Sequence, residues 1–167
     1  MSKFSYSKLN TYKTCPFRFY LQYEQGHYIH TDNIAVNFGS LIHETEEAIA
    51  HAIQNKQPIN YIELKNNLIK RLAVLQHDFK ADYFKVDTKS DRTYNDKAYE
   101  YLDCSIYNLE KFMCEHPTYE IVGIEQKFNF NFDADHSFSG AIDRVFHDCA
   151  TDRYYIQDIK TWAVPAE

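Results

Sequence analysis

The sequence predicts an α+β protein in which helices come first and strands follow. In the first 116 residues, apolar side chains recur three or four positions apart, which is the period of an amphipathic helix. Beyond residue 119, apolar and polar side chains alternate, which is typical of a strand with one buried face. Glycine and proline number only four each, which argues against a disordered or linker-rich chain. We expect one domain over residues 1–167, mainly helical over 1–116, with a three-stranded antiparallel meander over 119–160.

Five helices are expected before residue 116. Ser5 offers a hydroxyl N-cap for the first, and Pro16 begins the second, because proline is tolerated in the first turn of a helix but not in its interior. Loops are expected over 26–35 and 84–95. The clearest apolar stripe consists of Leu64, Leu68, Leu72, Leu75 and Phe79. The expected helices cover residues 6–13, 16–23, 40–55, 61–79 and 96–115.

Three strands are expected in the C-terminal part. In the first of them, apolar residues such as Val122 and Ile124 alternate with polar ones. The expected strands cover residues 122–132, 138–147 and 153–160, with turns at 133–136 and 149–152.

Two acids are expected to face each other in the second hairpin. If its turn is symmetric about Ala150 and Thr151, Asp143 lies directly across from Asp158, with the Cβ atoms about 5 Å apart. Two carboxylates at that separation repel each other unless a cation lies between them. The sequence therefore predicts a metal site at this pair.

Lys160 follows Asp158 by two positions, and side chains two apart on a strand point to the same face. Such a pair suits phosphodiester chemistry, because the carboxylate can hold a divalent cation while the ammonium lies over a water or a phosphate oxygen. The alternative is an ordinary Asp–Lys ion pair on an exposed strand, which contributes little stability.

The formal net charge of −6 is unfavourable for binding phosphates, but the charge is unevenly distributed. Residues 1–23 contain four cations, seven aromatic rings and no acid. Such a segment can contact the phosphates and stack the bases of a nucleic acid; alternatively, its rings belong to the core. The candidates for nucleic-acid contact are Lys8, Tyr12, Lys13, Arg18 and Tyr20.

The four cysteines form no Cys-x-x-Cys pair, so we expect free thiols of an intracellular protein rather than a closed zinc site. No apolar run is long enough to cross a bilayer, and the N-terminus is not a signal peptide. We therefore expect no membrane association and a cytoplasmic location.

Four segments carry a resemblance to a known family. The first is Ser5–Leu9, followed by Cys15–Tyr20; the others are Gly39–Glu44, Gly140–Arg144 and Asp158–Thr161. In this order they resemble the opening signature and the histidine, Gly-x-Ile-Asp and Asp-x-Lys-Thr motifs of the PD-(D/E)XK nuclease superfamily. The branch they resemble is the RecB-like one, which includes the nuclease domains of AddAB-type recombination helicases and the CRISPR-associated adaptation exonucleases.

The resemblance implies a restriction-endonuclease-like sheet and a divalent cation, Mg²⁺ or Mn²⁺, held by His43, Asp143, Asp158 and the backbone carbonyl of Ile159. Mixed nitrogen and oxygen ligation leans toward Mn²⁺, whereas oxygen ligands and waters suit Mg²⁺. The cation would lower the pKa of a bound water, and Lys160 would orient that water or stabilise the developing negative charge.

The family often has a further glutamate on the preceding strand, which makes Glu125 a supporting catalytic candidate. A hairpin centred on Ala134 and Asp135, however, sets Gln126 across from Asp143. A one-residue bulge would reverse this assignment.

The sequence departs from the family in two ways. In many relatives the cysteine of the first motif is the first ligand of an iron–sulfur cluster; Cys15 matches that ligand alone, so no cluster is expected in this chain. The family core also continues beyond the Asp-x-Lys-Thr motif with a helix and a strand. We therefore expect a sheet that is truncated at its C-terminus and completed by a missing C-terminal segment or a protein partner, or else a degenerate copy.

These residues and the resemblance together predict metal-dependent hydrolysis of DNA phosphodiester bonds. We expect an exonuclease, rather than a site-specific restriction enzyme, that acts in recombination, repair, phage or defence DNA processing. The N-terminal segment would guide single-stranded DNA or a frayed end. The alternative is a catalytically silent nucleic-acid-binding or assembly module derived from the same fold.

Overall fold

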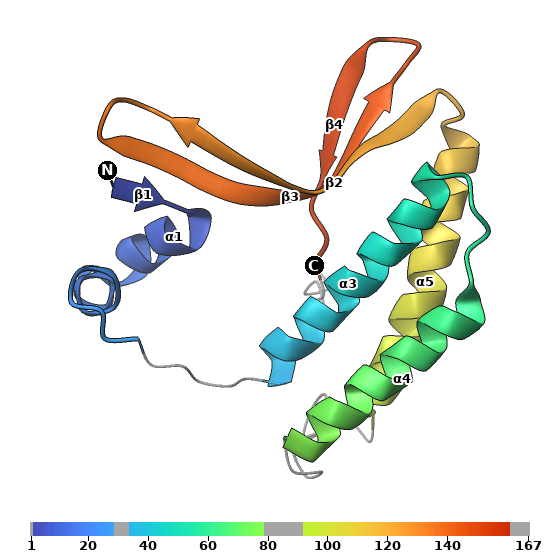
Figure 1. Ribbon diagram of the computed structural model, residues 1–167, viewed down its shortest axis with the longest axis horizontal. Helices are drawn as coiled ribbons and strands as arrows, with labels where there is room; N and C mark the ends of the chain where they lie inside the picture. The colour runs from blue at the N-terminus through green and yellow to red at the C-terminus, as the bar shows by residue number, and fades with distance from the viewer. Residues whose placement is uncertain (1, 29–33, 79–91, 161–167) are drawn as a thin grey trace, which may run out of the picture. The chain divides into compact units, whose positions relative to one another are not determined.

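The computed structural model describes residues 2–28, 34–78 and 92–160, which form five α-helices, one short π-helix and a four-stranded mixed sheet (Figure 1). The prediction of an α+β fold is confirmed. In chain order the elements are β1 (Ser2–Phe4), α1 (Tyr6–Thr14), α2 (Pro16–Phe19), the π-helix η1 (Tyr20–Glu24), α3 (Ile34–Gln54), α4 (Tyr61–Asp78), α5 (Tyr94–Glu115), β2 (Tyr119–Asn131), β3 (His136–Asp148) and β4 (Arg153–Gln157).

The chain divides into two compact units. The first consists of residues 1–31 and 125–142, and the second of residues 32–124 and 143–167. The long strands β2 and β3 contribute to both units, and each unit is described by itself below. A single domain over residues 1–167 stays a prediction.

Strand β3 is the centre of the sheet, because it pairs with each of the other three strands. It runs parallel to β1, with His136 opposite Ser2, and antiparallel to β4, with Asp148 opposite Arg153. The three strands of the predicted meander are present as β2, β3 and β4, and β1 adds a fourth, parallel strand that the sequence did not predict. Strand β1 was missed because three residues are too few to show an alternation, and its parallel partner lies more than a hundred residues away in the sequence.

The register between β3 and β4 agrees with the symmetric turn expected from the sequence. The pairs run from Asp148 opposite Arg153 to Arg144 opposite Gln157. The expected strand over 153–160 is too long, since β4 ends at Gln157. Asp143 and Asp158 are the next residues in register beyond the last pair of this ladder.

A β-bulge interrupts β2. It is recognised by comparing the number of residues on β2 and on β3 between two hydrogen bonds that join these strands. The amide of Phe132 donates to the carbonyl of His136, and the amide of Cys149 donates to the carbonyl of Thr118. Between these bonds the β2 side of the hairpin contains one residue more than the β3 side. Glu125 has a φ of 45°, a left-handed conformation that bulges use, so we place the extra residue there.

The turn between β2 and β3 sets this register. The Asp133 carboxylate accepts the backbone N–H groups of Asp135 and His136 at 2.8 and 2.9 Å, and so closes the hairpin between Phe132 and His136. Counting back from that closing pair brings Glu125, rather than Gln126, level with Asp143. Of the two registers that the sequence left open, the structure therefore has the one that sets Glu125 across from Asp143, because the hairpin is centred on Ala134 alone.

The three long helices of the second unit bury the hydrophobic core. Helices α3, α4 and α5 pack side by side (Figure 1), and Ile121 on β2 and Phe146 on β3 complete the core. The predicted apolar stripe of α4 is confirmed, because its members are buried or packed against the core; only Phe79 lies outside the described residues. The fully buried side chains include Phe38, Ile42, Ile49, Leu68, Leu72 and Leu102.

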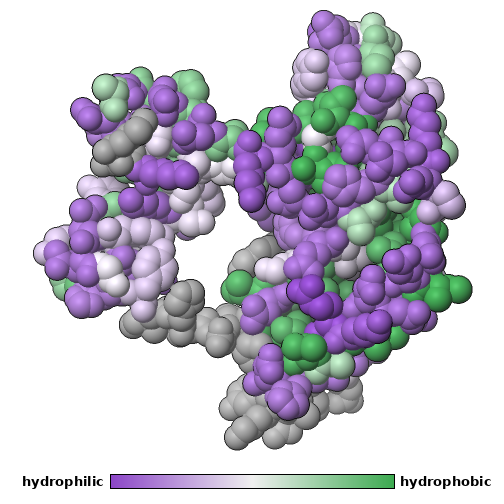
Figure 2. All heavy atoms as spheres, in the orientation of Figure 1, coloured by the Kyte–Doolittle hydropathy of each residue, from purple (hydrophilic) through white to green (hydrophobic). Residues whose placement is uncertain are grey.

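The surface of these helices is mostly polar. On the face that Figure 2 shows, hydrophilic residues prevail, with smaller groups of apolar residues among them. Within the described part of the chain, no helix has both the length and the apolar character needed to cross a bilayer.

Two of the long helices begin earlier than the sequence predicts. The predicted loop over 26–35 ends earlier than expected, since α3 already begins at Ile34; residues 29–33 lie outside the described residues. Helix α5 begins at Tyr94 rather than at residue 96, because Thr93 and Asp96 form a reciprocal capping box. The rest of the predicted loop over 84–95 lies mainly outside the described residues.

Asp148 ties the β3–β4 turn to the start of β2. Its carboxylate accepts the hydroxyls of Thr118 and Thr151 at 2.7 and 2.5 Å, and the N–H of Ala150 at 3.1 Å. These donors, with that of Thr151 contributing most, hold the pKa of Asp148 below its usual range. The side chain is almost completely buried, so its hydrogen bonds fix the turn that carries β4.

In the first unit, β1 pairs with β3 and leads into the short helices α1, α2 and η1. The helices α1, α2 and η1 contain no buried residue, so this unit lacks the extensive core of the second. Ser5 accepts the Lys8 N–H as the predicted N-cap. The ring of Phe128 explains why residue 140 is a glycine. A Cβ at this position would lie 2.8 Å from the Cζ atom of Phe128, so any larger residue would displace that ring.

Replacing Thr93 by Ala tests the capping box. The Thr93 hydroxyl accepts the Asp96 N–H at 3.2 Å, and Asp96 in turn accepts the Thr93 N–H at 2.9 Å. Thr93→Ala removes one of these bonds and should lower the free energy of unfolding by about 1 kcal/mol, as measured by urea denaturation. The control is Thr45→Ala, because Thr45 donates only to a carbonyl of its own helix. Equal stabilities of the two variants would contradict the assignment.

Candidate metal centre

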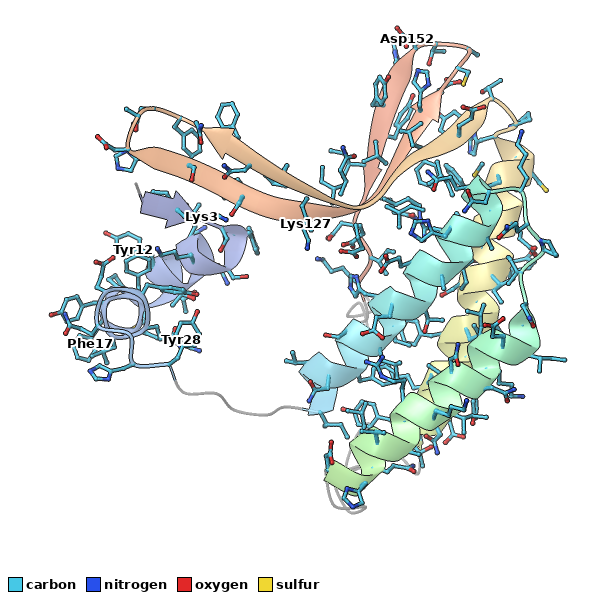
Figure 3. The ribbon with its side chains drawn as sticks, in the orientation of Figure 1. Lys3, Tyr12, Phe17, Tyr28, Lys127 and Asp152 are labelled. Atoms are coloured by element: carbon cyan, nitrogen blue, oxygen red, sulfur yellow. The ribbon has the colours of Figure 1, made fainter. Side chains whose placement is uncertain are left out.

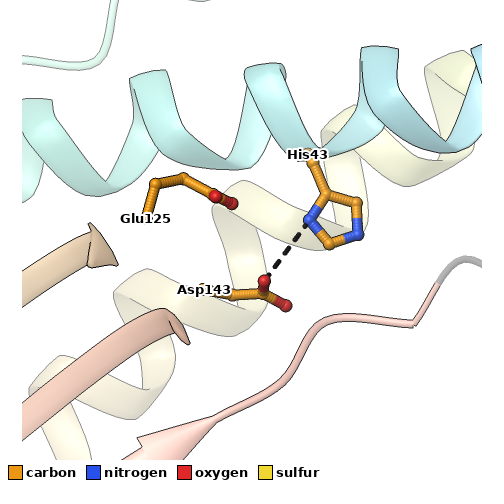
Figure 4. Close-up of side chains that lie close together, drawn as sticks. All are labelled: His43, Glu125 and Asp143. Carbon is orange, nitrogen blue, oxygen red and sulfur yellow. Dashed lines mark ion pairs between the residues drawn. The ribbon is translucent and has the colours of Figure 1, made fainter. Parts of the chain in front are cut away.

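A histidine on α3 and an aspartate on β3 lie close together in the second unit (Figure 4). His43 Nδ1 is 3.7 Å from Asp143 Oδ1, and the two side chains are 33% and 12% exposed. Both groups are thus partly shielded from water yet still accessible. The site contains an imidazole nitrogen and a carboxylate oxygen on two different elements, which is a common basis for a metal site.

The carboxylate of Asp143 is held from its other side. The N–H of Ile159 donates to Asp143 Oδ2 at 2.5 Å, while Oδ1 faces His43. Because this bond comes from the chain just beyond β4, the carboxylate is fixed between two segments. The sequence predicted that the backbone carbonyl of Ile159 binds the cation. The structure shows a different contact at this residue, the hydrogen bond from its backbone N–H to the Asp143 carboxylate.

Glu125 is the third member of the cluster. Each of His43, Glu125 and Asp143 offers a ligand atom, and these atoms all lie within 4.8 Å of one another. Glu125 lies on β2, at the bulge. Figure 4 shows its side chain close to those of His43 and Asp143. Among the described residues, this is the group of histidine, cysteine or acidic side chains that could hold a metal ion.

The donor set fits a divalent cation. Two ligand atoms bound to one ion at about 2.1 Å can be no more than about 4.2 Å apart. The observed limit of 4.8 Å is slightly larger, so small side-chain rotations would bring the three donors into range. One imidazole and two carboxylates suit Mg²⁺ or Mn²⁺, and a cation would offset the repulsion between the two carboxylates.

Asp158 and Lys160 lie close to each other, outside that three-residue cluster. Lys160 Nζ is 2.6 Å from Asp158 Oδ2, and the side chains are 64% and 62% exposed. We expected both residues to lie on one face of a strand. That expectation is wrong, because β4 ends at Gln157 and both residues follow it. They still lie next to Asp143, because Ile159 between them donates to its carboxylate. Thr161 of the same motif lies outside the described residues.

The predicted nucleic-acid contacts lie together in the first unit, on α1, α2 and η1. The rings of Tyr12, Phe17 and Tyr20 are 55%, 68% and 48% exposed, so they do not form a core within this unit (Figure 3). Lys8 lies over the rings of Phe4, Phe19 and Tyr23 at 5.3–5.8 Å. Lys13 and Arg18 are exposed on the same helices.

Cys15 has a structural part to play in this segment. Its Sγ atom accepts the N–H of Arg18 at 3.4 Å, so it caps α2, and Pro16 occupies the first helical position.

A buried ion pair next to the site was not foreseen from the sequence. Arg144, which follows Asp143, is 2% exposed and pairs with Glu46 on α3 at 3.1 Å. Arg144 also lines a pocket of about 470 Å³ together with Gln157, Lys160 and residues of α5. A contact between residues 98 positions apart leaves no local pattern, so no periodicity could have indicated it.

A comparison with models of protein families shows which family this chain belongs to. The sequence model of the PD-(D/E)XK nuclease superfamily matches residues 3–167. The chain belongs to the PD-(D/E)XK nuclease superfamily. Members of this superfamily are in general metal-dependent nucleases, which agrees with the donor set of the cluster. No curated protein and no solved structure gives a match. Membership in the RecB-like branch stays a prediction.

Loss of the imidazole should weaken metal binding by this PD-(D/E)XK protein. We expect His43→Ala to lower the affinity for Mn²⁺ at least about 10-fold in isothermal titration calorimetry, because one of three converging donors is removed. The control is His51→Ala on the same helix, whose imidazole pairs with Glu47 and is half-exposed. Equal Mn²⁺ affinities of the two variants would exclude His43 as a ligand.

Proposed function

We propose that this chain is a metal-dependent nuclease that hydrolyses DNA phosphodiester bonds, and that it acts as an exonuclease. The observation that carries the proposal is the convergence of His43, Asp143 and Glu125 in a member of the PD-(D/E)XK superfamily. Recombination, repair, phage or defence DNA processing are the settings in which we place it, in the cytoplasm.

The proposed cation is Mg²⁺ or Mn²⁺, which when bound lowers the pKa of a water and offsets charge on the scissile phosphate. His43 and Asp143 would hold it, with Glu125 as a supporting group. The amide of Ile159 restrains Asp143, so one carboxylate oxygen remains directed toward His43. This arrangement holds the donors before the substrate arrives, which lowers the reorganisation needed during reaction.

Asp158 and Lys160 would act beside this cluster. We propose Asp158 and the Ile159 carbonyl as further cation ligands, and Lys160 as the group that orients the water or stabilises the developing negative charge. The Asp158–Lys160 pair is exposed, so its separation costs little free energy. Lys160 can therefore leave Asp158 for a phosphate oxygen without a large loss of stability.

DNA, as a single strand or a frayed end, is the proposed substrate. The exposed tyrosines Tyr12 and Tyr20 would stack on bases, while Lys8, Lys13 and Arg18 would contact phosphates. Residues 1–23 carry no acid, so this segment attracts a polyanion despite the net charge of −6.

One observation favours a second candidate function. Asp158 pairs with Lys160 and lies outside the three-residue cluster among the described residues. If that pair persists with DNA bound, the Asp-x-Lys motif contributes nothing to cleavage. The chain would then be a catalytically silent nucleic-acid-binding or assembly module.

Cleavage assays separate the two candidates. We expect the wild-type protein to degrade linear DNA with Mg²⁺ or Mn²⁺ and not with EDTA. Asp158→Ala and Lys160→Ala should each lower the rate about 100-fold or more, because each removes a group that acts on the reacting atoms, with DNA binding retained. The control is Lys111→Ala, which breaks a similarly exposed Lys–Glu pair on α5.

The form of the DNA distinguishes the mode of attack. Circular DNA has no end, so an exonuclease leaves it intact while it degrades the linear form. Cutting of circular DNA would exclude the exonuclease, and lack of cleavage by the wild-type protein with either metal would favour the silent module.

The cations of the first unit should determine the salt dependence of DNA binding. For Lys13→Gln with Arg18→Gln, we expect weaker binding of a fluorescent single strand at low salt. We also expect the slope of log affinity against log salt to flatten by about 1.4, because two phosphate contacts are lost. Lys56→Gln with Lys111→Gln removes the same charge elsewhere and serves as the control. An identical slope in both double variants would contradict the assignment of this surface.

A further inference from the structure

The buried ion pair between Arg144 and Glu46 connects the two elements that carry the candidate metal ligands. Arg144 Nη2 donates to Glu46 Oε2 at 3.1 Å and to the Glu46 backbone carbonyl at 3.3 Å. Arg144 Nη1 donates to Gln157 Oε1 at 2.9 Å. A single guanidinium therefore binds α3 through side chain and main chain, and β4 through Gln157. All of these residues belong to the second unit.

The pair lies one step away from each ligand. Glu46 follows His43 by three residues, which is about one turn along α3, and Arg144 directly follows Asp143 on β3. The ion pair and the His43–Asp143 contact thus join the same helix to the same strand at neighbouring points. A shift of α3 along β3 that separated His43 from Asp143 would also have to break the ion pair.

Stability alone does not account for this arrangement. The side chains of Arg144 and Glu46 are 3% and 11% exposed, so both charges have lost most of their hydration. Buried pairs of this kind are often no more stabilising than well-packed apolar residues. In addition, Arg144 Nε is buried without a hydrogen-bond partner among the described residues, which costs free energy. A pair that gains so little stability is better explained by the geometry that it imposes.

We propose that Arg144 and Glu46 are positioning residues that hold His43 and Asp143 at the separation a divalent cation requires. This inference rests on the proposed function, since it concerns the same metal site. Neither residue touches the cation or the DNA; both act through the placement of α3 on β3. Breaking one partner alone would strand a buried charge, whereas breaking the pair as a whole would loosen the metal site and leave the fold intact.

A second ion pair of α3 provides a matched comparison. Glu44, the residue after His43, pairs with Arg71 on α4 at 2.7 Å, and these side chains are 49% and 57% exposed. This pair joins α3 to another helix and not to the strand that carries Asp143. It has the same charges on the same helix, and it should be irrelevant to the metal site.

The test compares two charge-neutral double variants, Glu46→Met with Arg144→Met and Glu44→Met with Arg71→Met. Each removes one positive and one negative charge, so a change in Mn²⁺ affinity reports position rather than net charge. Calorimetric titration with MnCl₂ gives the affinity, and thermal unfolding without metal gives the stability. For the first double variant we expect an unfolding temperature close to that of the wild type and at least about a 10-fold loss of Mn²⁺ affinity. The second should bind Mn²⁺ as the wild type does.

Arg144→Lys keeps the experiment decisive if the first double variant fails to fold. Lysine retains the ion pair with Glu46 but lacks the planar fork that also reaches Gln157, so we expect a smaller loss of Mn²⁺ affinity. Wild-type Mn²⁺ affinity in a folded Glu46→Met, Arg144→Met protein, or in Arg144→Lys if only that variant folds, would overturn the proposal. A wild-type protein that binds no Mn²⁺ would overturn it as well. A wild-type protein that binds Mn²⁺ but cuts no DNA would instead overturn the proposed function and leave the positioning role intact.

Discussion

A buried guanidinium is stable only if an acidic group lies beside it. For Arg144 that group comes from α3, which is distant in the sequence. The partner is Glu46, so the position of α3 against β3 is set by a charge that cannot be left alone. Strand β3 in turn pairs with every other strand of the sheet. Helices α4 and α5 pack against α3 and form the hydrophobic core with it, so their positions also depend on how α3 lies against β3. Hydrophobic burial supplies most of the free energy of this unit, while the ion pair supplies the alignment.

Much of the fold follows from local sequence patterns. The apolar stripe that includes Leu68 and Leu72 predicted a helix and its buried face, because a long periodic pattern admits few other solutions. The register of β3 against β4 followed from a symmetric four-residue turn. By contrast, β1 was missed, since a three-residue strand is defined only by the strand it pairs with. The predicted start of α5 is two residues late because Thr93, which precedes Asp96 by the spacing of a capping box, lies in the predicted loop.

The candidate site shows how a single residue of register decides which side chains meet. The motifs identified His43 and Asp143, and the structure brings these two together. Whether Glu125 or Gln126 joins them depends on the turn at Asp133, whose carboxylate closes the hairpin one residue earlier than a symmetric two-residue turn would. An aspartate two residues before a turn amide is a recognised turn-forming pattern, so this signal was present in the sequence. The Arg144–Glu46 contact left no such signal, because it joins two elements through tertiary packing alone.

The bulge at Glu125 also has a consequence for how the hairpin can change over evolutionary time. Side chains on a strand alternate between faces, so an odd insertion or deletion exchanges the two faces of everything beyond it. The bulge already absorbs one extra residue, and loss of any single residue between Glu125 and Asn131 could be accommodated only by straightening the strand. If the lost residue were Asn131, the rings of Phe128 and Phe130 would then swap faces, and the packing of Phe128 over Gly140 would be lost. Length variants of this hairpin should therefore be tolerated in steps of two residues and concentrated at its tip.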